Sequence, residues 1–294
     1  MAFTTSLSSA QLDAFFMVSQ TKNFSRAAEK LLITQSALSQ RIMNLESELG
    51  TSLFIRDRAG LQLTEIAHKL LRYYQTKSAL EDEFFTSLNS KDSLLSGIVR
   101  IGSFSSIMRS VLIPSLADLL RENSGLRLNV VTRELRSLPD MLRTGEIDFM
   151  VLDYTIDRED LASIELGQEV NILVESKLHK SPDIYLDHDE HDQITLKYLK
   201  ATGKKASTVK RRYLDDVYGL IDGVKLGLGR AVLPKHLVAA DPDLRILDPQ
   251  KTLKLPVVLH FYHQPYYTKL HQAVVHALTE QSKRRLLSDL PSKK

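Results

Sequence analysis

The segment 24–50 constrains the fold more than any other part of the chain, because it holds two short helical patterns separated by a tight turn. Ser25 is placed to cap the first helix, and Thr34 is placed to cap the second. The small side chains of Ala27 and Ala28 let the two helices cross closely. The apolar stripe of the second helix consists of Leu38, Ile42, Leu45 and Leu49. These features predict a small helical domain that holds the second helix out from the body.

The exposed face of this second helix carries polar side chains that suit contact with DNA. A projecting helix N-terminus can enter the major groove and also favours an anionic phosphate. Glutamine can pair with an adenine edge, and arginine can bind a phosphate or a guanine. The predicted DNA contacts are Arg26, Thr34, Gln35, Ser36, Ser39, Gln40 and Arg41. The alternative is a helical hairpin that merely packs on a larger core.

A short β-hairpin is predicted over 54–63, with its turn at Ala59-Gly60. Arg56 and Arg58 lie in this hairpin, where they would sit over the sugar-phosphate backbone as a wing. The DNA-binding domain is therefore assigned to residues 1–63.

One long helix is predicted from residue 64 to residue 89, because apolar residues recur throughout it every three to four positions. A helix of about 25 residues is roughly 37 Å long. An apolar stripe of that length outside a compact domain needs a partner helix. Residues 64–90 are therefore predicted to form a linker and dimerisation helix.

The composition excludes several other classes of protein. The chain has 294 residues, enough for two or three units, and it contains no cysteine. A disulfide framework and a thiolate metal site are thereby excluded, and a reducing cytoplasm is expected. Neither a signal peptide nor an apolar run of about 18 residues is visible, so no membrane partner is expected. The net charge of +3 does not indicate nucleic acid by itself.

Beyond residue 97, strand patterns alternate with helical patterns, which predicts a doubly wound α/β domain over 97–294. Strands are expected at 98–101, 126–132, 147–152, 168–175, 184–186, 230–233 and 257–263. Helices are expected at 113–122, 138–144, 193–201, 214–226 and 269–285. The domain is divided into lobe I (97–167 and 257–294) and lobe II (168–256).

The chain resembles the LysR-type transcriptional regulators over a long run of residues. Their signature is matched by Ala27, Ala28, Leu31, Thr34 to Ser39, Ile42, Leu45, Glu46, Leu49, Gly50, Leu53, Phe54 and Arg56. A weaker likeness covers the rest of the chain, including Gly145-Glu146-Ile147-Asp148. The chain departs from the family pattern at Ala67, where glycine is usual, and at Gly125, where proline is usual.

This resemblance implies a winged helix-turn-helix, a linker helix and a two-lobed domain like those of periplasmic solute-binding proteins. The implied partners are promoter DNA, a small-molecule effector in the cleft between the lobes, and RNA polymerase. The implied assembly is a dimer through residues 64–90 that pairs again, through the sensor lobes, into a homotetramer. The resemblance implies a cytoplasmic regulator that is not an enzyme and needs no cofactor.

Several residues are candidates for the effector site. Ser103, Ser105 and Ser106 lie between a strand and a helix, where hydroxyls and backbone N–H groups can bind an anion such as a carboxylate. The alternative is that these serines only cap the helix. Thr132 ends the second strand and would face the same cleft.

Asp187 and His188 open a run of acids and histidines in lobe II. The run could attract a cationic group of the effector, bind a metal, or form a solvated loop; consecutive residues do not easily converge on one ion, so no metal is predicted. An Asp-His pair here also resembles the regulators of arginine and lysine export, which makes a basic amino acid a candidate effector. Tyr213 and Gly229 could contact ligand, or serve capping and close packing.

Two alternatives come from other functional classes. An enzyme could use the α/β cleft, but no nucleophile elbow, P-loop or His-Glu-x-x-His motif occurs. A solute-binding protein would need an export signal and would have no use for the N-terminal helices. A transcriptional regulator is therefore favoured.

Overall fold

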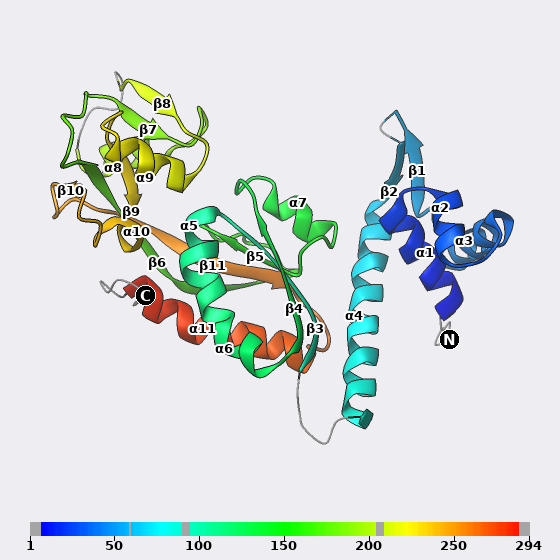
Figure 1. Ribbon diagram of the computed structural model, residues 1–294. Helices are drawn as coiled ribbons and strands as arrows, with labels where there is room; N and C mark the ends of the chain where they lie inside the picture. Colours follow the sequence, from blue (N-terminus) through cyan, green and yellow to red (C-terminus); the bar gives the residue numbers. More distant parts are fainter. Residues whose placement is uncertain (1–6, 59, 90–94, 204–208, 288–294) are drawn as a thin grey trace. The chain divides into compact units, whose positions relative to one another are not determined.

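The computed structural model describes residues 7–58, 60–89, 95–203 and 209–287. The chain divides into two compact units, Met1–Lys91 with Arg143–Glu146 and Asp92–Leu142 with Ile147–Lys294 (Figure 1). Within the described ranges, no helix combines the length and the apolar character needed to cross a lipid bilayer.

Three short helices form the head of the first unit: α1 (Ser9–Thr21), α2 (Phe24–Lys30) and α3 (Gln35–Leu49). Thr34 caps α3 as predicted, because its side-chain oxygen accepts a hydrogen bond from the backbone N–H of Ala37 at 3.2 Å. The predicted Ser25 cap of α2 is wrong. Asn23 caps this helix instead and accepts from the N–H of Arg26 at 3.0 Å, so α2 begins two residues earlier.

The two strands of the predicted wing and the linker helix are present, whereas Ala59 of the predicted turn and residue 90 of the predicted linker lie outside the described residues. Strands β1 (Phe54–Asp57) and β2 (Gly60–Leu63) pair antiparallel, and α4 (Glu65–Asn89) follows as one helix of 25 residues. The apolar core of the head joins all of these elements. It consists of Leu12, Ala14, Phe15, Val18, Ala27, Ala28, Leu38, Ile42, Leu45, Leu53, Ala67, Leu70 and Leu71.

The second unit is built on a mixed seven-stranded sheet with the order β10-β6-β11-β5-β3-β4, in which β9 also pairs with β6. Strand β3 runs parallel to β4 and β5, whereas β11 runs antiparallel to β5 and β6. The strands are β3 (Ser96–Ser103), β4 (Gly125–Thr132), β5 (Phe149–Leu152), β6 (Leu161–Ser176), β9 (Ala231–Pro234), β10 (Leu244–Leu247) and β11 (Leu253–Tyr262).

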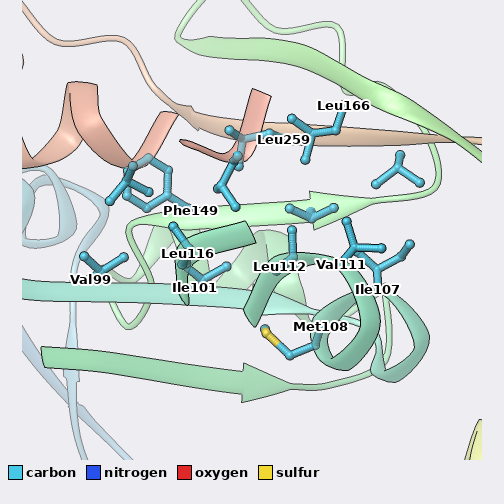
Figure 2. Close-up of a cluster of buried hydrophobic side chains, with 14 of the residues drawn as sticks. Val99, Ile101, Ile107, Met108, Val111, Leu112, Leu116, Phe149, Leu166 and Leu259 are labelled. Carbon is cyan, nitrogen blue, oxygen red and sulfur yellow. The ribbon is translucent and has the colours of Figure 1, made fainter. Parts of the chain in front are cut away.

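Helices cover the β3–β5 part of this sheet on both faces. On one face a continuous helical run comprises α5 (Ser105–Ile107), the π-helical turn η1 (Met108–Leu112) and α6 (Ile113–Glu122), and α6 packs against α11 (Lys269–Leu287). Side chains of this run and of the sheet interdigitate in the largest apolar cluster (Figure 2). On the other face α7 (Leu138–Arg143) contributes Leu138 and Leu142 to a smaller cluster.

Strand β6 continues from one half of the unit into the other. Its first part, from Leu161 to Asn171, pairs with β11, and its last residues pair with β9 and β10. The sequence predicted only the stretch from 168 to 175. The smaller half also holds β7 (Tyr185–Asp187) parallel to β8 (Arg211–Tyr213), together with the helices α8 (Ile194–Ala201), α9 (Val217–Lys225) and α10 (Lys235–Val238).

Candidate functional site

The start of α3 presents a polar, solvent-facing surface. Thr34, Gln35, Ser36 and Gln40 are exposed, and Ser39 and Arg41 are half-buried. The opposite face of the helix is fixed, because Leu38, Ile42 and Leu45 are buried in the core of the head. Packing thus orients α3 so that its polar side chains point outward.

Hydrogen bonds organise these polar side chains further. Ser25 donates to Oε1 of Gln35 at 3.0 Å, and Nε2 of Gln40 donates to Oδ1 of Asn44 at 2.8 Å. Ser25 and Asn44 were not among the DNA contacts predicted from the sequence. The signal for Asn44 was its position four residues after Gln40, which places both side chains on one helix face.

The head carries four arginines on α3 and the elements next to it in the sequence: Arg26 on α2, Arg41 on α3, Arg56 on β1 and Arg58 after β1. Arg26, Arg56 and Arg58 are exposed. In the described part of the head, none of the four forms an ion pair with a carboxylate. Unneutralised guanidinium groups around a projecting helix suit the binding of phosphates.

Glu46 links α3 to the wing. Its Oε1 accepts a hydrogen bond from the backbone N–H of Leu53 at 2.7 Å, immediately before β1. Leu53 itself is fully buried in the core of the head. The wing arginines are therefore held in a fixed relation to α3.

The three serines predicted for the effector site lie close together, at the end of β3 and in α5, but they differ in exposure. Ser103 is buried, and its Oγ lies 3.4 Å from the carbonyl oxygen of Val151. Ser106 is buried, and its Oγ donates to Oε1 of Glu169 at 2.9 Å. Ser105 is half-buried at the start of the helical run. Two of the three hydroxyls are therefore engaged inside the protein.

Thr132 is exposed at the end of β4, Tyr213 is largely exposed at the end of β8, and Gly229 lies in a tightly packed stretch. A Cβ atom on Gly229 would lie 2.7 Å from the carbonyl oxygen of Ile184 and 2.8 Å from a side-chain carbon of Leu186. Close packing therefore explains this glycine without a ligand.

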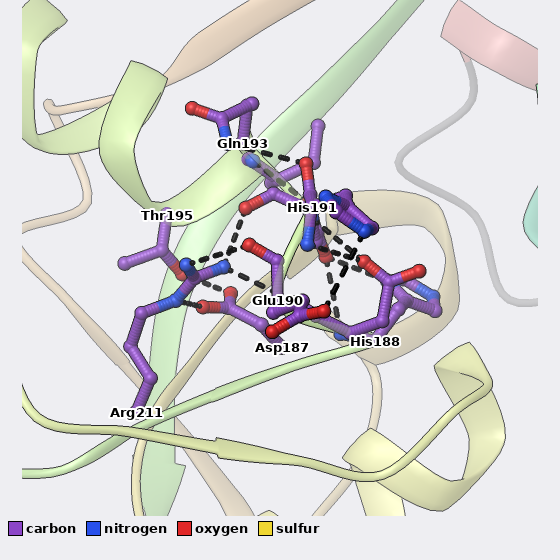
Figure 3. A network of polar contacts seen from close by, with 10 residues as sticks. Asp187, His188, Glu190, His191, Gln193, Thr195 and Arg211 are labelled. Atoms are coloured by element: carbon purple, nitrogen blue, oxygen red, sulfur yellow. Dashed lines mark hydrogen bonds and ion pairs between the residues drawn. The ribbon is translucent and has the colours of Figure 1, made fainter. Parts of the chain in front are cut away.

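Asp187 and His188 belong to a polar network at the end of β7 (Figure 3). Asp187 is 2% exposed, and its carboxylate accepts hydrogen bonds from Thr195 and from Nε of Arg211. Burial nevertheless raises the pKa of Asp187. The guanidinium of Arg211 also donates to carbonyl oxygens of the loop that follows Asp187.

His188 pairs with Asp192, whose Oδ2 lies 2.8 Å from Nδ1 of the ring. Burial disfavours the charged imidazole, but the hydrogen bond and the negative charge of Asp192 outweigh this effect and raise the pKa of His188. Within the described residues, no three acids or histidines are arranged to hold a metal ion.

A second buried polar group was not predicted from the sequence. It lies where β6 passes between the two halves of the second unit, which we call the sensor unit. Glu169 is 5% exposed, and desolvation raises its pKa to about 7. Nε2 of His236 lies 3.9 Å from its Oε1 and 2.9 Å from Oγ of Ser110. Desolvation lowers the pKa of His236 to about 4. Both residues were hidden because neither belongs to a recognisable motif.

Two family models together match most of the chain. Residues 9–68 match the bacterial regulatory helix-turn-helix protein of the lysR family, and residues 92–283 match the LysR substrate binding domain. The two matched segments correspond to the helical head with its wing and to the sensor unit.

Curated relatives are regulators. The transcriptional regulator HdfR of Yersinia enterocolitica is 33% identical over 180 residues, which is 61% of this chain and 61% of that relative. The Synechococcus elongatus protein named probable HTH-type transcriptional regulator LrrA is 29% identical over 236 residues, 76% of this chain and 80% of that relative. The chain therefore aligns with less than two thirds of HdfR.

Solved structures share the fold at low sequence identity. ArgP of Mycobacterium tuberculosis is 21% identical with a TM-score of 0.77, covering 98% of this chain and all of that chain (100%). LysG of Corynebacterium glutamicum, solved with bound effector arginine, is 16% identical with a TM-score of 0.76, covering 94% and 98%. These likenesses confirm the winged helical head, linker helix and two-lobed α/β unit predicted from the sequence.

Proposed function

This chain belongs to the LysR family of bacterial regulatory helix-turn-helix proteins, and we propose that it is a transcriptional regulator whose binding to promoter DNA responds to a small molecule. One observation carries the DNA-binding part. The N-terminal half of α3 exposes polar side chains, and the same head carries four arginines that form no ion pair with a carboxylate of the described head. A regulator of this kind acts in the cytoplasm, with RNA polymerase as a further partner.

In the proposed complex, α3 and the wing contact different parts of the DNA. Ser36, Gln40 and their neighbours on α3 read base edges in the major groove. Arg56 and Arg58 on the wing bind the sugar-phosphate backbone, which contributes affinity without sequence preference. The hydrogen bond from the N–H of Leu53 to Glu46 connects α3 to the wing and would hold the two sets of contacts in a fixed relation.

Helix α4 is the proposed dimerisation element. Four of its large hydrophobic side chains are more than half exposed within the single chain: Tyr73, Phe84, Phe85 and Leu88. An exposed stripe of this kind is covered when two copies pair along the helix. We further propose that sensor units pair again to form a tetramer.

The effector is proposed to bind between the two halves of the sensor unit, and an amino acid is the proposed class. Ser105, partly exposed at the start of the helical run, would bind the carboxylate. LysG, which shares the fold, holds arginine as its effector. Effector binding would alter the relation between the lobes and thereby the spacing of the DNA-reading heads.

Fluorescence anisotropy with a duplex from the promoter region next to the protein's own gene tests the DNA-binding part. Replacing Arg56 with alanine should weaken binding and reduce the slope of log K against log salt by about 1, because one phosphate contact is lost. Arg121→Ala is the matched control, since this exposed arginine lies in the sensor unit and the charge change is the same. An unchanged affinity and slope in Arg56→Ala would refute the wing assignment. An enzyme or a solute-binding protein would not bind the duplex at all.

A further inference from the structure

Asp187, the acid that the sequence assigned to a cationic ligand group, is already neutralised within the protein. Its buried carboxylate bonds to Arg211 and Thr195 (Figure 3). Any incoming cation would have to displace a guanidinium that also bonds to the following loop. Asp187 is therefore poorly placed to recognise a charged effector.

Glu169 differs from Asp187 because its partners are neutral. Its Oε1 accepts a hydrogen bond from the hydroxyl of Ser106 at 2.9 Å. The basic group that it meets is His236, at 3.9 Å, and the low pKa of this histidine leaves it uncharged near neutral pH. No lysine or arginine of the described sensor unit forms an ion pair with Glu169.

A buried carboxylate without a charged partner is energetically unfavourable. Glutamine at this position would form the same hydrogen bonds without the cost of burying a charge. A perturbed acid of this kind in a junction between lobes is typical of a functional site rather than of a structural core. The charge of His188 favours ionisation of Glu169, but desolvation outweighs it and raises the pKa, so a cationic ligand would stabilise the ionised carboxylate further.

The surroundings of Glu169 strengthen this conclusion. Asp153 follows β5, and desolvation raises its pKa despite Lys197, whose Nζ lies 3.9 Å away. The electrostatic influence of Asp153 on Glu169 disfavours the ionised form of Glu169. Two desolvated acids, one on β6 and one directly after β5, favour a cation over a neutral or anionic ligand.

We propose that Glu169 is the specificity-determining residue of the effector site and binds an ammonium or guanidinium group of an organic cation, such as a basic amino acid or a diamine. This inference rests on the proposed function, because it assigns the chemical class of the effector that the sensor unit takes. Ser106, which bonds to Glu169, is one of the residues predicted from the sequence for the same site.

Single side chains connect the helical turn after β3 with the helices of the smaller half of the unit. His236 on α10 bonds to Ser110 of the π-helical turn at 2.9 Å. Arg109 of the same turn lies over the ring of Tyr218 on α9, 4.3 Å from its centroid. π-Helical turns frequently mark functional sites. Because Glu169 is 5% exposed, a ligand must displace side chains around it to reach the carboxylate.

Isothermal titration calorimetry on the full chain tests the proposal with L-arginine, L-lysine and putrescine as cationic probes. L-Citrulline and L-norleucine serve as neutral counterparts of the two amino acids. Glu169→Gln keeps the shape and hydrogen bonds of the side chain but removes its charge. Glu165→Gln is the matched control, because Glu165 lies on the same strand and is exposed.

At least one cation should bind the natural chain and Glu165→Gln, and its affinity for Glu169→Gln should be at least tenfold lower. The neutral counterparts should bind the natural chain at least tenfold more weakly than the cations. Equal binding by the natural chain and Glu169→Gln would overturn the proposal, as would the absence of binding by all three cations. Promoter binding by the ligand-free chain, measured on the same samples, separates such a failure from a failure of the proposed function.

A second measurement keeps the proposal testable if Glu169→Gln does not fold. A cation paired with Glu169 favours the ionised carboxylate, so binding at pH 7 should release up to about half a proton per cation. Titrations in two buffers with different ionisation enthalpies measure this release. Binding that releases no protons would contradict the assignment.

Discussion

Removing the guanidinium of Arg211 tests how the sensor unit holds its buried acid. Arg211 and Asp187 are both largely buried, and the arginine also bonds to the loop that follows Asp187. Replacing Arg211 with methionine keeps much of the apolar volume but leaves the carboxylate of Asp187 without its charged partner. Breaking a buried ion pair from one side costs about 3–5 kcal/mol.

Urea unfolding of the full chain, followed by far-ultraviolet circular dichroism, measures this cost. With an m-value of about 2–3 kcal/mol/M, the transition of the sensor unit should move down by about 1–2 M urea. The double variant Asp187→Asn with Arg211→Met should recover most of the loss, because no buried charge is left without a partner. Arg212→Met is the control, since Arg212 is exposed on the same strand.

The loss of stability in Arg211→Met should depend on pH in a definite direction. Burial already raises the pKa of Asp187 in the natural chain. The loss of Arg211 should raise this pKa further, so the deficit should be full at neutral pH and shrink as the pH falls and Asp187 becomes protonated. A change below about 1 kcal/mol in Arg211→Met, or a double variant no more stable than the single one, would refute the reasoning.

Three other perturbations give clear expectations. Leu38→Ala removes a fully buried side chain beneath α3 and should cost about 2–5 kcal/mol by urea unfolding; a loss below about 1 kcal/mol would contradict the packing. Thr34→Ala removes the cap of α3 and should cost about 1 kcal/mol, a result checked against Ser47→Ala on the exposed part of the same helix. The affinity for the best cationic probe should rise about tenfold from pH 6 to pH 8, because the pKa of Glu169 is about 7 and only its ionised form attracts the cation. The groups facing Glu169 are Ser106, His236, Asp153 and His188. A cation affinity of the natural chain that does not change with pH would contradict the role of Glu169.

Local signals in the sequence were sufficient to predict the long helix α4 and the capped start of α3. Thr34 before α3 and the regular apolar stripe of α4 have purely local causes, namely a side-chain cap and a helical period. The Ser25 cap failed because Asn23 and Ser25, two positions apart, can both cap a helix, and Asn23 makes the bond. Propensity alone does not decide between such neighbours.

Elements and contacts that depend on distant residues could not be predicted. Strand β8 has only three residues and exists because Arg211 to Tyr213 pair with β7. The partner of Asp187 is 24 positions away, and the polar neighbours of Glu169 come from positions 106 and 236. Nothing in the local sequence distinguishes Glu169 from Glu165 on the same strand; only the fold shows which of the two is buried.

Sequence preference in DNA binding tests the central claim most directly. Dissociation constants for the promoter duplex and for a scrambled duplex of equal length should differ by at least about tenfold for the natural chain. In Gln40→Ala the two constants should approach one another, while binding to the scrambled duplex stays unchanged, because base contacts are lost and phosphate contacts remain. If Gln40→Ala and Ser36→Ala both kept the full preference, α3 would not be the element that reads the bases.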